Sequence, residues 1–98
     1  MTAASEMHYI DVQWIHSDEA EPVRLMSELD GERFETRKLA FFRDGRVEHA
    51  DATFSTDRTE LGQVAVPALA EINGDAEFHG IGIERDVFEA EWRRAVGS

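Results

Sequence analysis

The sequence predicts a single α+β domain, with an antiparallel sheet of four to five strands and a C-terminal helix packed on one face. Two Asp-Gly pairs, Asp30-Gly31 and Asp44-Gly45, lie between strand-like segments. Asp-Gly favours tight hairpin turns because glycine readily adopts a positive φ, so the two pairs predict a central three-stranded meander. Near the C-terminus, apolar side chains recur at helical spacing.

The chain has 98 residues, which suits one packed domain, and we place that domain at residues 8–96. Residues 1–7 are mostly small or polar, and we expect them to be flexible. Hydrophobic residues make up 42% of the chain, which is enough for a packed interior. No repeat or linker divides the chain further.

Residues 8–16 alternate between apolar and polar side chains, which predicts a half-buried strand. Ile10, Val12 and Trp14 would lie on one face of this strand. An acidic loop at 17–22 follows, and residues 23–29 form the next predicted strand. There Arg24, Met26 and Glu28 would lie opposite Val23, Leu25 and Leu29.

The register of the third strand, residues 33–42, depends on the first turn. If Asp30-Gly31 is a two-residue turn, Glu28 faces Arg33, and Glu28, Arg33, Glu35 and Arg37 share one face. A shift of one residue would move each of these side chains to the other face. The second turn is expected to pair Phe42 with Val47.

The second half of the chain gives weaker signals. We expect a helical turn at 57–61 with Asp57 as its cap, a short strand at 64–66, and a short helix from Pro67 to Ile72. Residues 79–83 would form an edge strand. The last element is a helix with an apolar stripe, and Ile83 is placed to pack on Phe88 at its start.

The charge of the chain restricts its partners. Acidic residues outnumber basic ones by 21 to 10, giving a formal net charge of −11. Nucleic acids and anionic membranes are bound through Lys and Arg, so we expect neither as a partner. The acidity either serves solubility or attracts a basic protein partner.

Other classes of site are excluded by composition. The chain contains no cysteine, so disulfides and thiolate sites are ruled out. His8 and His16 lie at opposite ends of one predicted strand and cannot share a metal. We therefore expect no catalytic residue, metal or cofactor. The start of the chain has no secretory signal, and no apolar run would span a membrane, so we expect a cytoplasmic protein.

The candidate binding residues gather around the first hairpin and the end of the first strand. Charged side chains on one sheet face either form a cross-strand charge ladder or present guanidinium groups to a carboxylate or phosphate. A histidine at a strand end is either structural or part of the same site. The candidates are Trp14, His16, Glu28, Asp30, Arg33, Glu35 and Arg37.

Several spaced motifs resemble a family of small uncharacterised bacterial domains, often found as single-domain proteins in actinobacteria. The motifs are Trp14-Ile15-His16, residues 27–38 (SELDGERFETRK), Phe42-Arg43-Asp44-Gly45, Glu71-Ile72-Asn73 and residues 88–92 (FEAEW). The resemblance runs from about Tyr9 to Ala95. It implies a free-standing bacterial cytosolic domain and implies no catalytic residue.

Three functions are compatible with these observations. The leading hypothesis is a protein-binding or inhibitory module, such as an immunity or antitoxin protein acting on a basic partner. The second is an enzyme or small-ligand binder that uses Glu28, Arg33, Arg37 and His16. The third is a homodimeric structural protein with Leu39 and Phe41 at its interface.

Overall fold

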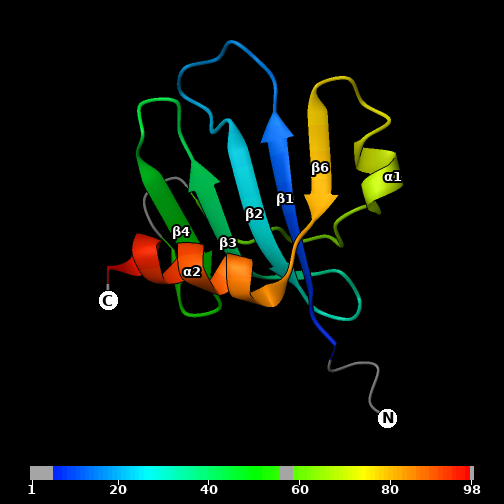
Figure 1. The fold of residues 1–98 in the computed structure, drawn as a ribbon, viewed down its shortest axis with the longest axis vertical. Coiled ribbons are helices and arrows are strands. Elements are labelled where there is room, and N and C mark those ends of the chain that lie inside the picture. Colours follow the sequence, from blue (N-terminus) through cyan, green and yellow to red (C-terminus); the bar gives the residue numbers. More distant parts are fainter. Residues whose placement is uncertain (1–5, 56–58, 98) are drawn as a thin grey trace.

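The computed structural model describes residues 6–55 and 59–97 and has the predicted α+β architecture. Its sheet is antiparallel throughout, in the order β5-β4-β3-β2-β1-β6, so β1 to β5 form a meander and β6 joins beside β1 (Figure 1). The two-residue β5 brings the sheet to six strands. The elements are β1 (His8–Trp14), β2 (Arg24–Leu29), β3 (Glu35–Phe41), β4 (Val47–Asp51), β5 (Phe54–Ser55), α1 (Leu69–Ile72), β6 (Phe78–Gly82) and α2 (Arg85–Val96).

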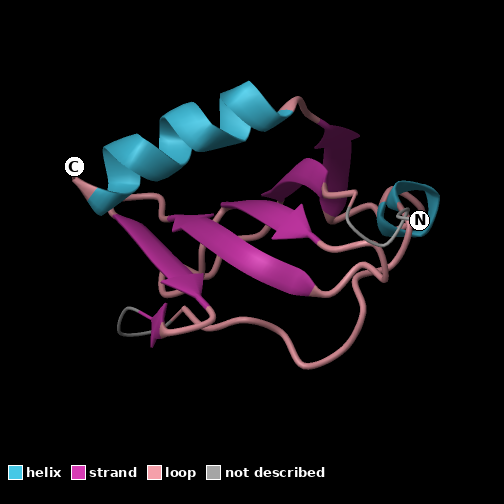
Figure 2. Ribbon diagram, turned by 90° about the horizontal axis from the view of Figure 1, so that it is seen from below, coloured by secondary structure: helices cyan, strands magenta, loops and turns pink. Residues whose placement is uncertain are grey.

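One face of the sheet is covered by α2, which lies across it in Figure 2. Phe88 is completely buried, in a cluster with Tyr9, Met26 and Leu39, and Ile83 packs against the same cluster as predicted. Asp86 lies in the first turn of the helix and arginines lie in the last, which matches the helix dipole. The helix ends at a left-handed glycine with φ 81°. The C-terminal helix is thus confirmed.

The opposite face is covered by a long irregular segment, of which residues 59–68 are described, and by the short helix α1. We call residues 59–68 the covering segment. The segment passes on the side of the sheet away from α2 (Figure 2). Ile10, Val12 and Leu29 are buried here, with partly buried apolar side chains of the covering segment and of α1 packed against them. α1 has only four residues and none of them is fully buried. This second core is therefore smaller and less completely covered.

The two-residue turn considered for Asp30-Gly31 does not form, and the register that the sequence left open is set by a longer loop. The N–H of Asp30 bonds to the carbonyl of Phe34 at 2.9 Å, and the N–H of Arg33 bonds to the carbonyl of Asp30 at 2.9 Å. The loop therefore has three residues, and Arg33 takes its left-handed position with φ 69°. The Asp30 carboxylate accepts hydrogen bonds from the N–H groups of Glu32 and Phe34. Asp30 thus shapes the turn, and Gly31 does not supply the positive φ.

The longer loop changes the pairing of β2 with β3. Glu28 pairs with Arg37, and Leu29 pairs with Glu35, which leaves Thr36 as an extra residue on β3. Such an irregularity moves the side chains before it to the other face of the sheet. Glu35 therefore does not share a face with Arg37, contrary to the prediction.

The second hairpin also has a three-residue loop. Phe42 and Arg46 close it, with the N–H of Phe42 bonded to the carbonyl of Arg46 at 2.8 Å. Gly45 occupies the left-handed position with φ 94°. As a result Phe41, and not Phe42, pairs with Val47. The expected register was wrong by one residue, so the side chains of β4 lie on the faces opposite to those expected.

Three further elements can be compared with the prediction. Residues 64–66 form no strand, and the N–H of Val66 bonds instead to the carbonyl of Arg33 at 2.8 Å. The short helix is present but begins at Leu69, and the edge strand is present as β6. The helical turn predicted at 57–61 depends on Asp57, which lies outside the described residues.

The outer edge of β6 is occupied by an asparagine side chain. The Asn73 amide donates to the carbonyl of Gly80 at 2.9 Å and accepts from its N–H at 2.6 Å. It thus pairs with Gly80 as a neighbouring strand would. A Cβ at Gly80 would lie 3.0 Å from the side chain of Leu69 and 3.2 Å from that of Val12, so these neighbours would have to shift by a few tenths of an ångström to accept it.

Candidate functional site

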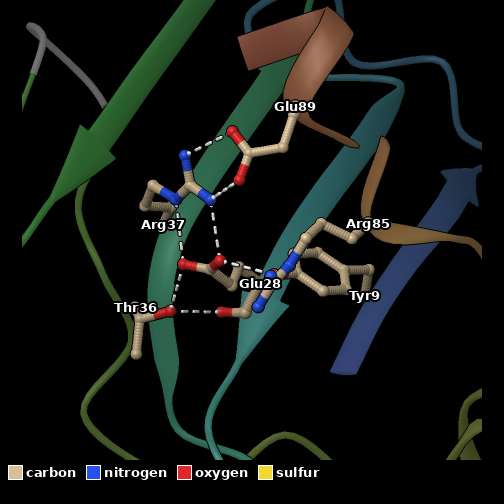
Figure 3. A network of polar contacts seen from close by, with 6 residues as sticks. All are labelled: Tyr9, Glu28, Thr36, Arg37, Arg85 and Glu89. Carbon is tan, nitrogen blue, oxygen red and sulfur yellow. Dashed lines mark hydrogen bonds and ion pairs between the residues drawn. The ribbon is translucent and has the colours of Figure 1, made fainter. Parts of the chain in front are cut away.

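The predicted charged cluster forms in part, between the sheet and α2. Arg37 donates to both carboxylate oxygens of Glu28 at 2.9 and 2.7 Å and to both of Glu89 at 3.2 and 2.6 Å. Figure 3 shows its guanidinium between these two carboxylates. The guanidinium carbon also lies 5.0 Å from the ring centre of Phe88 and 5.1 Å from that of Trp92. Arg37 therefore joins β2 and β3 to the helix.

The contacts within this cluster shift the pKa values of Glu28 and Tyr9 from their ordinary values. Arg37 lowers the pKa of Glu28 to about 2, with further help from the hydroxyls of Thr36 and Tyr9 and against the effect of burial. Burial raises the pKa of Tyr9, while the hydrogen bond from Arg85, 3.0 Å from the hydroxyl, lowers it. Glu28 accepts hydrogen bonds from Arg37, Thr36 and Tyr9 on its two oxygens. Four bonds use the full capacity of a carboxylate, so Glu28 is not available to a ligand.

Two other predicted site residues, Arg33 and Glu35, bond to the main chain of the covering segment. Arg33 donates to the carbonyl oxygens of residues 66 and 67 at 2.8 and 2.7 Å. Glu35 accepts from the N–H of Gly62 at 2.7 Å and lies 3.6 Å from the amine of Lys38. Both residues therefore fasten the covering segment to the sheet.

The remaining predicted residues lie elsewhere. The rings of Trp14 and His16 have centres 4.3 Å apart, and Trp14 also stacks on Phe78 at 5.9 Å. His16 hydrogen-bonds the carbonyl of Pro22 at 2.8 Å. Asp30 belongs to its turn. The residues proposed for an enzyme or small-ligand site thus do not converge on one pocket.

The two residues proposed for a homodimer interface lie on the sheet face that α2 covers. Leu39 is completely buried, and Phe41 packs against the same cluster beneath α2. Leu39 is therefore not exposed for contact with a second copy of the chain, whereas Phe41 is partly exposed.

The sheet face away from α2 carries a groove that the sequence did not indicate. It has a volume of about 420 Å³, which lies within the usual range for ligand sites. Its floor is formed by β1 and β2 and its walls by residues 66–78. The lining is mainly apolar, with Ile10, Val12, Leu25, Val66, Ile72 and Phe78.

Three carboxylates also line this groove. Glu35 is the one that is paired with Lys38, whereas Glu71 and Asp75 are exposed. Within residues 6–55 and 59–97, neither Glu71 nor Asp75 takes part in an ion pair. Of the residues that the structure describes, no arginine or lysine lines the groove. An apolar group that carries a positive charge matches this lining.

The alternation of apolar residues placed Ile10 and Val12 on one face of the first strand and Leu25 on one face of the second. It did not predict the groove, because the position of residues 66–78 is set by Arg33 and Glu35, which are distant in sequence.

In the part of the chain that the structure describes, no group of three or more acidic, histidine or cysteine side chains is placed to hold a metal ion. Neither described helix has the length and apolar character needed to cross a bilayer.

Comparison with known proteins gives a family but no activity. No curated protein and no solved structure shows significant similarity to this chain. Residues 8–97, which include every described helix and strand, match a family that is described as a domain of unknown function, DUF6881. The chain belongs to this DUF6881 family.

Proposed function

We propose that this protein is a binding module for a basic partner protein, and that its role is inhibitory, as in an immunity or antitoxin protein. The observation that carries the proposal is the distribution of its charges. Most described basic side chains are bound within the molecule, whereas many carboxylates are exposed and take part in no ion pair.

The basic residues are engaged in two ways. Arg24, Arg37, Lys38, Arg46 and Arg94 form ion pairs with carboxylates. Others donate to uncharged acceptors, as Arg33, Arg43 and Arg85 do. Among the described residues, the exposed carboxylates outside every ion pair are Glu6, Asp18, Glu19, Glu21, Glu32, Glu60, Glu71, Asp75, Glu77, Glu84 and Asp86.

Several of these carboxylates lie at one end of the sheet. The loop after β1 contains Asp18, Glu19 and Glu21, and the turn before β6 contains Asp75 and Glu77 (Figure 1). The two segments are joined by a 2.7 Å bond from the N–H of residue 15 to the carbonyl of residue 77. A surface of one sign attracts an oppositely charged protein and speeds its association, whereas phosphate polyanions are repelled.

The test begins with the partner itself. Proteins captured on the immobilised chain from its source organism at low salt are identified, purified and titrated by calorimetry. We expect a basic partner whose affinity falls as salt rises, because charge attraction is screened. If the partner is an enzyme, one equivalent of this protein should suppress its activity.

A charge variant provides the control. Asp18→Asn, Glu19→Gln and Glu21→Gln together remove the carboxylates of one loop and should weaken binding at low salt more than at high salt. An acidic partner, an affinity independent of salt, or no specific partner would contradict the proposal.

A further inference from the structure

The groove on the sheet face away from α2 is built in advance of any ligand. Arg33 holds the main chain at residues 66 and 67 through two hydrogen bonds of 2.8 and 2.7 Å. Glu35 holds Gly62, and the amine of Lys38 donates to the carbonyl of Glu60 at 3.2 Å. These polar contacts fix the covering segment to the first hairpin and to β3. The segment therefore stays in place without filling the groove.

The groove presents apolar surface to water. Ile10 and Val12 form its floor, and Val66, Ile72 and Phe78 remain only partly buried around it. Apolar surface that is held open in a concave site is the usual receptor for an apolar side chain. Recognition of a protein segment through a few such anchors is common at interfaces.

The rim adds charge selectivity. Glu71 and Asp75 are exposed beside the apolar walls and form no ion pair with any residue in 6–55 or 59–97. A lysine or arginine next to the apolar anchor would meet both carboxylates. A carboxylate at that position would be repelled.

From this geometry we propose that the groove docks a segment of the basic partner, with an apolar side chain inserted toward Val12 and an adjacent Lys or Arg on Glu71 and Asp75. The inference rests on the proposed function and adds where the partner binds and through which side chains. The rest of the acidic surface then contributes attraction at longer range.

The test uses three acetylated pentapeptides and amide NMR spectra of the whole chain. The first peptide alternates three lysines with a leucine and a phenylalanine. The second replaces the two apolar residues with serine, and the third replaces the lysines with glutamate. We expect the first to bind best and to shift the amide signals of Val12, Val66 and Ile72.

Variants separate the groove from the general charge. Val66→Trp fills the groove and should weaken the first peptide at least about tenfold. Glu71→Gln with Asp75→Asn should weaken it about threefold to tenfold at low salt. The matched control, Glu84→Gln with Asp86→Asn, removes two exposed carboxylates at the start of α2 and should change binding less than about twofold. The dispersion of the spectra reports whether each variant is folded. If Val66→Trp does not fold, the double variant Glu71→Gln with Asp75→Asn still tests the proposal, because both side chains are exposed.

The outcomes distinguish the two proposals. If the serine peptide binds as well as the first, or the shifts lie outside the groove, docking in the groove is overturned while recognition of a basic partner stands. If the glutamate peptide binds as well as the first, the groove accepts apolar ligands of either charge. That result would contradict the proposal that the partner is recognised by its positive charge. No shift with any peptide at about 1 mM would overturn the docking proposal.

Discussion

The two faces of the sheet are closed in different ways. Under α2, apolar side chains pack around an arginine that is paired with two carboxylates, and the helix covers this part of the face. On the other face, polar side chains hold a covering segment in place and a groove remains. The contacts under α2 should contribute more to the free energy of folding, whereas the other face leaves apolar surface accessible to solvent. The comparison shows that the two faces of one small sheet are packed differently: one is closed by the helix α2, and the other keeps an apolar groove.

Arg37 and Lys38 show the contrast at neighbouring positions of β3. Both side chains are 20% exposed. Arg37 makes close bonds to Glu28 and Glu89, whereas Lys38 lies 3.6 Å from Glu35 and donates to a main-chain carbonyl. Alternation along the strand sends one side chain to each face.

The largest effect is expected from removing the arginine. Arg37→Met leaves the Glu28 carboxylate buried without its cation, which should lower the free energy of unfolding by about 3–5 kcal/mol. Lys38→Met is the matched variant, with an expected loss of about 1 kcal/mol or less because its ion pair is long. Urea unfolding of both proteins measures the difference. Equal losses would remove the distinction between the two faces.

The pH dependence should come mainly from the α2 face. The pKa of Glu28 is about 2 in the folded protein against 4.5 as its ordinary value. Its contribution, on the order of 3 kcal/mol, is therefore complete above pH 4.5 and is lost as the pH falls toward 2. Arg37 also lowers the pKa of Glu89, which acts in the same direction.

Urea midpoints measured between pH 7 and pH 2 test this dependence. The gap between the parent protein and Glu28→Gln should be widest at neutral pH and should close as the pH falls below 4.5. Subtracting the variant removes the general effect of protonating the many surface carboxylates. Parallel curves for the two proteins would show that Glu28 carries no pH-dependent stability.

A smaller effect is expected on the groove side, at the edge of β6. Asn73→Ala removes both hydrogen bonds to Gly80 and should cost about 1–2 kcal/mol. It also exposes an unpaired strand edge, so sedimentation should show self-association. Gln63→Ala is the control, because Gln63 is exposed and its side chain bonds to no described residue. A monomeric Asn73→Ala of unchanged stability would show that the amide does not protect the edge.

The elements that follow a local sequence pattern are those that could be predicted correctly. Alternation placed the side chains of β1 and β2 on their correct faces, and the apolar stripe and terminal charges located α2. These patterns depend on the same physical forces that form each element. Glu28 and Arg37 were also predicted to share one face, and they belong to one charged cluster.

The site could not be predicted because it depends on contacts between distant parts of the chain. An Asp-Gly pair is compatible with loops of two or three residues, and the local sequence does not select between them. Arg33 accepts a left-handed conformation while bonding to residues 66 and 67, more than thirty positions away. Those bonds hold residues 66 and 67 in the wall of the groove, and no short-range sequence pattern predicts them.

The two hairpins supply the finest test, because their loops determine which face each side chain of β3 and β4 occupies. Gly45 has φ 94°, and a Cβ there would meet nothing within 4 Å, so Gly45→Ala should cost about 1 kcal/mol through its backbone alone. Gly31 does not have a positive φ. Gly31→Ala should therefore be neutral or stabilise by a few tenths of a kcal/mol, since alanine restricts the unfolded chain. Equal losses in urea would place Gly31 in the left-handed region and favour the two-residue turn. That turn would return Arg33 to the strand and remove the wall of the groove.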